Sequence, residues 1–330
     1  EDLQPLPRGT NPLGIPATPG SVCPADAPVK SFNVVALDRP MKLNPKAPDA
    51  IEVDFERKIE MTMPEGKIFA LESEATTVAS GVTPNPLTLR VNLGDCIKVN
   101  LKNKMKASRA SFFAPGLAFD PKDSQGLNVG NNGGDQTIGP GERRAYTYYA
   151  HPLNKETTSL VWDGGNIVVN PRNGLYGAII VGPKGSQYRD PVTGADISQK
   201  NSWRADVIVD ASLPENVGKR NYRDVALFFQ DEDNIIGTAF MPYVQNVAGL
   251  TSVNYRAEPY KFREEQGCSL GKIFQPCVVG KPEDPATPVI EAHAGDALRI
   301  HVIGANSEQN GMFGIEGHEW PIEPYMPGAD

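Results

Sequence analysis

The residues best able to bind a transition metal or to attack a substrate are scarce in this chain. It contains four histidines and four cysteines. It has no Cys-x-x-Cys pair, no Gly-x-Ser-x-Gly elbow, no phosphate-cradling glycine loop and no His-Glu-x-x-His helix. We expect His293 and His301 to be satisfied or solvated histidines; a mononuclear metal site that uses both is the alternative. The sequence therefore predicts no catalytic residue in this chain.

One loop is dense in oxygen donors. Its candidate ligands are Asp120, Asp123, Asn128 and Asp135, separated by several glycines. Calcium prefers carboxylate and carbonyl oxygens from an adaptable loop of this kind. A calcium site is therefore a hypothesis for residues 120–135, beside the simpler interpretation of a solvated surface loop with Asx turns.

The cysteine positions favour two disulfide bonds. Cys268 and Cys277 bracket a short loop, which is typical of a disulfide-closed hairpin. Cys23 lies in a proline-rich segment and Cys96 in an expected strand, so a bond between them would pin that segment to the first folded unit. Four free thiols, or a metal ion bound by cysteine, are the alternatives. Two disulfides would indicate an exported protein, in a periplasmic, cell-surface or extracellular location.

Composition favours short strands over long helices. The 330 residues include 32 glycines and 30 prolines, which suits many strands joined by turns. The formal net charge of −8 is spread along the chain without a basic stripe, so nucleic acid is not an expected partner. No apolar run approaches the roughly 18–20 residues that cross a membrane, so no membrane span is expected.

The pattern along the chain predicts an extended arm and two all-β units. Residues 1–30 are rich in proline and glycine and form the arm; residues 31–183 form the first unit, 184–202 a polar linker, and 203–330 the second unit. Alternating apolar and polar residues indicate strands with one buried face. The expected strands are 31–38, 51–63, 87–101, 143–150, 177–181, 205–209, 223–230, 289–302 and 312–315.

An internal repeat links the two units. Residues 91–116 and 292–317 align without a gap. Each copy runs through a Gly-Asp turn, Gly94-Asp95 or Gly295-Asp296, into an alternating strand. Each then reaches Phe-x-x-x-Gly, as Phe112-Phe113-Ala114-Pro115-Gly116 and Phe313-Gly314-Ile315-Glu316-Gly317.

This repeat resembles the cupredoxin repeat of multicopper oxidases, in which the corresponding strand reads Phe-His-x-His-Gly. Gly174-Leu175-Tyr176-Gly177-Ala178-Ile179-Ile180-Val181 resembles the closing strand of a first domain in that family, and Gly317-His318-Glu319-Trp320-Pro321 is similar to large members such as bacterial manganese oxidases and ceruloplasmin. The resemblance implies tandem cupredoxin-like Greek-key β-sandwiches.

The resemblance also implies copper-ligand positions, and this sequence has lost the ligands there. Imidazoles at alternate positions of a strand point to one face, which is why copper sites use that spacing. In this chain the ligand positions are occupied by Phe113, Pro115, Trp162, Gly164, Gly311, Gly314 and Glu316. No cofactor is therefore expected in this chain, and copper would have to come from sequence or partners outside it. Trp162 could instead contact a carbohydrate, although packing is the simpler interpretation.

By the same resemblance, the second unit is incomplete. Fewer residues follow its Phe-x-x-x-Gly segment than follow the first copy. Several sandwich strands would be missing, which would leave an open sheet edge. We therefore expect another protein chain, or the remainder of a longer polypeptide, to complete it.

Three functions fit these observations. The first is a copper-free structural portion of an exported protein or assembly of the multicopper-oxidase type. The second is the N-terminal part of an active multicopper oxidase, for metal ions or phenols, whose copper sites lie outside this chain. The third is a protein-binding module that uses its open sheet edge and its N-terminal arm.

Overall fold

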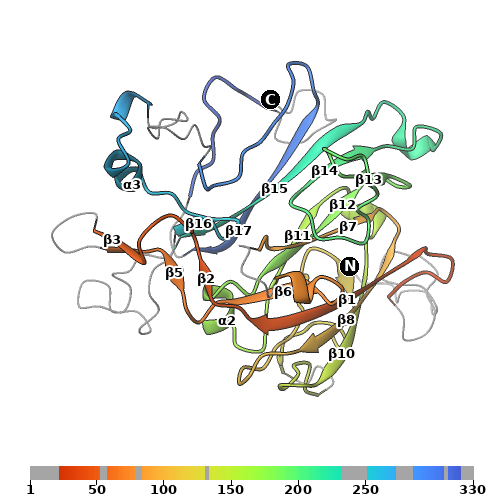
Figure 1. The fold of residues 1–330 in the computed structure, drawn as a ribbon. Coiled ribbons are helices and arrows are strands. Elements are labelled where there is room, and N and C mark those ends of the chain that lie inside the picture. The colour runs from red at the N-terminus through yellow and green to blue at the C-terminus, as the bar shows by residue number, and fades with distance from the viewer. Residues whose placement is uncertain are drawn as a thin grey trace, which may run out of the picture.

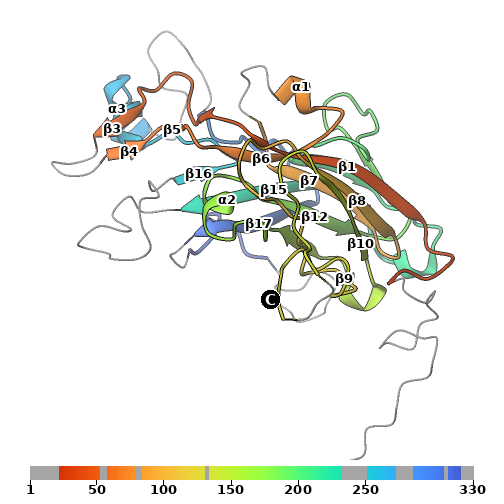
Figure 2. The ribbon, with the colours of Figure 1, turned by 90° about the horizontal axis from the view of Figure 1, so that it is seen from below.

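Strands dominate the computed structural model of the chain. It describes residues 22–52, 58–78, 84–130, 134–231, 251–272, 285–307 and 311–320. The strands form one sandwich of two sheets and a further sheet that packs against it (Figures 1 and 2). The predicted all-β class with cupredoxin-like sandwich topology is confirmed.

The first sheet of the sandwich has the strand order β6-β1-β8-β10-β9. Its members are β1 (Val29–Asp38), β6 (Lys67–Leu71), β8 (Cys96–Asn103), β9 (Ala118–Phe119) and β10 (Arg143–Tyr149). The β1–β8 pair is parallel, whereas β10 joins the other edge of β8 in antiparallel fashion. A parallel pair requires a crossover between sheets, as a Greek-key sandwich provides.

The second sheet of the sandwich has the order β11-β12-β7. Its members are β7 (Leu87–Asn92), β11 (Thr158–Val161) and β12 (Gly177–Gly182). Alternate apolar side chains of both sheets meet in one core, which includes Val99 and Leu101 of β8 and Phe112 of the loop after it. Burial of these side chains holds the sandwich together.

The second unit contributes a single sheet among the described residues. Its members are β13 (Gln187–Arg189), β14 (Arg204–Ile208), β15 (Tyr222–Asp231), β16 (Thr251–Val253) and β17 (Leu298–Ser307). The order is β13-β14-β15-β16, and β17 pairs in parallel with β15. Figure 1 shows β15 and β17 running side by side. The strand β13 falls within the predicted linker 184–202.

A second core joins this sheet to the sandwich. Tyr176 lies just before β12 and stacks on Phe228 of β15, with ring centroids 6.0 Å apart. Ala178 and Ile180 of β12 and Ile303 of β17 belong to the same buried cluster. The strands β7 and β12 are therefore buried on both faces, with the sandwich core on one side and the second unit on the other.

Short elements complete the described chain. Two small ribbons pair β2 (Met41–Lys42) with β5 (Thr62–Met63) and β3 (Ala50–Glu52) with β4 (Lys58–Glu60). The α-helices are α1 (Ala75–Val78), α2 (Val169–Arg172) and α3 (Tyr260–Glu265), and the 3-10 turns are η1 (Pro152–Asn154), η2 (Pro214–Asn216) and η3 (Leu270–Lys272).

The structure corrects three expected strands. The segment 51–63 contributes only the short strands β3, β4 and β5 among its described residues, because it forms small ribbons beside the sandwich. The strand expected over 289–302 begins only at Leu298, after the turn at Gly295. Residues 312–315 are coil, although Phe313 packs against Phe229 of β15.

Candidate functional site

Two of the positions that the resemblance maps to copper ligands lie directly opposite each other. The amide of Phe113 donates to the carbonyl oxygen of Trp162 at 2.9 Å, and the amide of Trp162 donates to the carbonyl oxygen of Phe113 at 2.8 Å. Phe113 packs edge-to-face on Phe119, with ring centroids 6.0 Å apart. Trp162 is 38% exposed. An aromatic pair thus occupies the place where the family resemblance implies imidazoles.

The other two positions in the first unit cannot present a ligand either. Pro115 lies exposed in a turn. Gly164 is closely surrounded, because a Cβ atom on it would overlap the carbonyl oxygen of Gly126 and the Cδ2 atom of Leu127. A histidine at position 164 would therefore require the neighbouring backbone to move.

Alanine at Gly164 is expected to lower the free energy of unfolding by about 1–3 kcal/mol, because it overpacks this contact. Gly314 is the matched control, since it occupies a mapped ligand position in the second unit and has open space around it. Alanine there should change stability by about 0.5 kcal/mol or less. Urea unfolding of both variants measures the difference, and equal stabilities would show that Gly164 is not confined.

Asp163, between Trp162 and Gly164, anchors the loop that contains them. Its carboxylate accepts hydrogen bonds from the amide of Ser111 at 2.7 Å, the amide of Asn166 at 2.9 Å and the side-chain amide of Asn170 at 2.8 Å. Burial raises the pKa of Asp163, although these donors oppose the shift. The carboxylate therefore anchors the backbone of this loop, and both of its oxygens accept hydrogen bonds from protein donors.

In the second unit, the positions that the resemblance maps to copper ligands are exposed. Within the described chain, none of them belongs to a group of side chains that could bind a metal ion. Gly311, Gly314 and Glu316 are exposed coil residues. His318 follows them, and its Nδ1 atom lies 3.1 Å from the carbonyl oxygen of Glu316. These residues do not assemble ligands for copper.

Each of the other three histidines has its own local partner. His151 is buried, and its Nδ1 atom accepts a hydrogen bond from the amide of Leu153 at 3.0 Å. His293 is exposed beside Asp296. His301 belongs to a buried ionic network described below. Over the described ranges, no three side chains of the His, Cys, Asp or Glu type group as metal ligands. The residues present therefore do not fit the copper centres that the resemblance implies.

The four candidate calcium ligands are divided between arginine partners and local turns. Asp135 pairs with Arg109, and its Oδ1 atom accepts from Asn128 at 2.9 Å. The hydrogen bonds from Asn128 and Thr137, together with Arg109, lower the pKa of Asp135 to about 2. Asp123 lies 3.6 Å from Arg144, and Asp120 accepts the amide of Lys122 in an Asx turn. The calcium hypothesis of the sequence stays a prediction.

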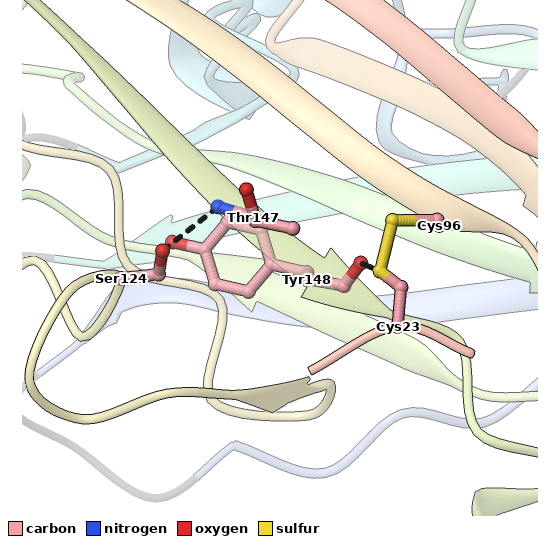
Figure 3. The surroundings of a disulfide bond; sticks show 5 residues. All are labelled: Cys23, Cys96, Ser124, Thr147 and Tyr148. Carbon is pink, nitrogen blue, oxygen red and sulfur yellow. Dashed lines mark hydrogen bonds between the residues drawn. A yellow bond between two sulfur atoms is a disulfide. The ribbon is translucent and has the colours of Figure 1, made fainter. Parts of the chain in front are cut away.

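One predicted disulfide is confirmed. Cys23 is bonded to Cys96 at the start of β8, and the Sγ atom of Cys23 lies 3.5 Å from the carbonyl oxygen of Tyr148 (Figure 3). On the other side of β10, the amide of Thr147 donates to Ser124 at 2.8 Å (Figure 3). The bond ties the N-terminal segment to the first sheet. Cys268 is also disulfide-bonded, and its expected partner, Cys277, lies outside the described residues.

A buried ionic network between the two units was missed by sequence reasoning. Asp224 on β15 lies 3.2 Å from the Nε atom of Arg90 on β7 and 2.9 Å from the Nε2 atom of His301 on β17. The hydroxyl of Thr158 on β11 lies 2.6 Å from Nδ1 of His301. Arg90 also donates to the carbonyl oxygen of Ser202. Three strands from both units therefore meet at one carboxylate, and β11 joins the network through His301.

The chemistry of this network favours a structural role over a catalytic one. Nε2 of His301 lies 2.9 Å from a carboxylate oxygen of Asp224, which can only accept, and the hydroxyl of Thr158 lies beside the other ring nitrogen. Burial alone would raise the pKa of Asp224, but Arg90 and His301 outweigh it and hold the pKa below its usual range. A hydroxyl, imidazole and carboxylate in sequence can activate a nucleophile. Here the carboxylate is also committed to Arg90.

The sequence contained a local signal for this network, in the form of charged residues within strands. Arg90 lies in a strand whose six residues are all buried, and Asp224 is buried directly before the apolar run of β15. Charged residues are almost never fully buried unless they are paired. Such positions indicate a buried partner, although they do not identify it.

Comparison with known proteins gives distant structural likenesses. No family model and no curated protein sequence matches the chain. A multicopper oxidase crystal structure is 17% identical with a TM-score of 0.40, over 72% of this chain and 58% of that one. The blue copper oxidase of Nitrosomonas europaea is 15% identical with a TM-score of 0.43, over 84% and 61%. The copper nitrite reductase of the same organism is 18% identical with a TM-score of 0.46, over 84% and 68%.

Coverage is partial on the side of these proteins. The chain spans 58% of the multicopper oxidase above and 55% of a second multicopper oxidase, mgLAC. Strand order and register carry the cupredoxin-like fold of this chain. Within the described ranges, no helix has the length and apolar character needed to cross a membrane.

Proposed function

We propose that this chain is a copper-free, cupredoxin-like structural unit of an exported protein or assembly of the multicopper-oxidase type. The observation that carries the proposal is the Phe113–Trp162 pair. Residues opposite each other on antiparallel strands direct their side chains to the same face. Two aromatic rings therefore occupy a face on which copper proteins of this type place imidazoles, and neither ring offers a ligand atom.

The joint between the two units supports a structural role. The stacked Tyr176–Phe228 pair and the Arg90–Asp224–His301 network bind the sandwich and the second sheet into one body. Removing a partner from a buried ionic pair is strongly destabilising. Such a joint fixes the relative position of two units, which is what a scaffold requires.

The Cys23–Cys96 disulfide supports export. Disulfides persist in oxidising compartments and are rare where thiols are kept reduced. Redox activity, in this proposal, belongs to copper sites in sequence or partners outside this chain. Calcium binding at residues 120–135 is a separate proposal, tested by calcium analysis of the chain and of its Asp120→Ala/Asp123→Ala variant.

Copper titration tests the proposed function with a built-in positive control. The double variant Phe113→His/Trp162→His places two imidazoles on the same face of the bridge, with Cβ atoms about 5 Å apart. We expect calorimetry to detect Cu(II) binding to this variant. The natural chain should show no stoichiometric binding of Cu(II). Equal binding by both, with a stoichiometry of one or more, would overturn the copper-free assignment.

A further inference from the structure

We propose that the outer face of the first sheet binds an acidic polysaccharide, a polymer of sugar units that carry carboxylate groups. This basic face consists of outward side chains of β1, β8 and β10, namely Asn33, Lys98, Asn100, Lys102, Arg143 and Thr147. Its cations bind the carboxylates of the ligand, and its amide and hydroxyl groups bind the sugar hydroxyls. The basic face is independent of the copper-free assignment, because none of its residues occupies a position mapped to a copper ligand.

Alternation along β8 brings two lysines to this face. Ile97, Val99 and Leu101 are fully buried in the sandwich core. Successive side chains of a strand point to opposite faces, so Lys98 and Lys102 point outward, about 13 Å apart. Among the described residues, neither lysine forms an ion pair, so both amino groups are available to a ligand. Because buried apolar residues separate the lysines, no basic run marks them in the sequence.

Like charges lie together at one end of the basic face, in a chain whose formal net charge is −8. Arg143 of β10 is the register partner of Lys102. Lys104, directly after β8, lies 3.8 Å from a Glu72 carboxylate oxygen that accepts from Arg143 at 3.1 Å. Three cations therefore lie beside Glu72. Like charges directly opposite each other in a sheet are destabilising, and a bound anion offsets that cost, so this end fits a carboxylate of the ligand.

A hollow of about 330 Å³ lies at the other end of the basic face. It is lined by Lys98 and its register partner Thr147, and by Asp120, Asp123 and Ser124 of the loop after β9. Figure 3 shows Ser124 beside Thr147, where the serine hydroxyl accepts the amide of Thr147. The volume is at the lower limit of ordinary small-molecule sites. The hollow therefore fits one sugar unit of the polymer.

The remaining side chains favour a sugar polymer over other polyanionic partners. Single-stranded nucleic acids are bound through aromatic side chains on which bases stack, and a membrane surface through apolar side chains that insert. The outward positions between the cations hold Asn33, Asn100 and Ala145 instead, and the side-chain amide of Asn100 donates to Asn33 at 3.1 Å. The carboxylates in the hollow repel phosphate groups but accept hydrogen bonds from sugar hydroxyls.

Calorimetric titration of the full chain with a short oligogalacturonate tests the basic face. A chelator is present throughout, because calcium would otherwise bridge ligand carboxylates to those of residues 120–135. We expect saturable binding that weakens as the salt concentration rises, since salt screens exposed charges. No binding at low salt, or equal binding of neutral dextran, would overturn the proposal. Equal affinity for a DNA duplex would assign the face to polyanions in general and would also overturn it.

Two variants of equal net charge locate the binding. Lys98→Gln/Lys102→Gln removes two cations from the basic face. Lys261→Gln/Lys272→Gln removes two from the segment of α3 and η3, and α3 lies well away from β8 in both views (Figures 1 and 2). We expect the first variant to bind oligogalacturonate about tenfold more weakly, as the loss of two exposed ionic contacts implies. The second should bind like the natural chain, and equal losses in both would overturn the proposal.

A third variant separates recognition of the sugar from attraction of its charge. Thr147→Val keeps the branched shape and the charge of the face but removes a hydroxyl from the lining of the hollow. We expect oligogalacturonate to bind this variant about threefold more weakly, because one hydrogen bond to a sugar hydroxyl is lost. An unchanged affinity would overturn the assignment of the hollow to a sugar unit.

Discussion

Replacing Asp224 with alanine is expected to lower the free energy of unfolding by about 3–5 kcal/mol. The carboxylate is buried and is shared by Arg90 and His301. Its removal leaves a buried guanidinium without its ionic partner. Since a domain is stabilised by only about 5–15 kcal/mol in total, this single change should remove much of the stability. Urea unfolding at neutral pH measures it.

The matched control is a neighbouring ion pair between β15 and β14. Arg223 precedes Asp224, and its Nε atom lies 2.8 Å from Asp206 in a partly exposed pair. Alanine at Asp206 should lower stability by about 1 kcal/mol or less, because solvent screens such a pair. If Asp224→Ala were no more damaging than Asp206→Ala, the network would not be what joins the two units.

Acid should weaken the same network. The pKa of Asp224 is lower in the folded chain than in the unfolded chain, where it is about 3.9. The carboxylate therefore contributes its full stability above the unfolded pKa, and the contribution is lost as the pH falls below about 4. We expect the natural chain to lose more stability than Asp224→Asn over that range. Parallel pH profiles for the two chains would contradict the assignment.

Loss of the Cys23–Cys96 disulfide should have an effect of similar size. The bond closes a loop with a sequence separation of 73. Cross-linking a loop of this length restricts the unfolded chain and is worth about 4 kcal/mol in the chain-entropy model. We expect the double variant Cys23→Ser/Cys96→Ser to unfold at correspondingly lower urea concentration. The variants are compared without reductant, because a reductant would also break the disulfide bond of Cys268.

Single variants provide the control for this loss. Because the bond needs both sulfur atoms, Cys23→Ser and Cys96→Ser should each lower stability about as much as the double variant. A double variant as stable as the natural chain would mean that the N-terminal segment is held by its packing against Tyr149 alone.

The sandwich strands were predictable where one face is buried and the other is not. The strand over 31–38 alternates in its first half, where Phe32 and Val34 face the sandwich core and Ser31 and Asn33 are exposed. The strand β6 was missed: all five of its residues are buried and it carries no alternation, whereas β12, which is also buried throughout, was recognised from the apolar run at 177–181. Residues 312–315 carry a strand pattern but are coil in the structure.

The candidate sites were likewise predictable only in part from the sequence. The repeat and the resemblance identified Phe113 and Trp162 one at a time, and their pairing across a bridge required the structure. The Arg90–Asp224 contact joins residues 134 positions apart, so no local pattern could pair them. The Cys23–Cys96 bond was predictable because only a few pairings of four cysteines exist.

Copper content after saturation tests the central claim most directly. The full chain would be incubated with excess Cu(I) and with excess Cu(II), desalted, and analysed by mass spectrometry for metal, beside the Phe113→His/Trp162→His variant. The copper-free assignment predicts only trace copper in the natural chain and retained copper in the variant. Stoichiometric copper in the natural chain, with the visible charge-transfer band of a thiolate-bound copper, would contradict it.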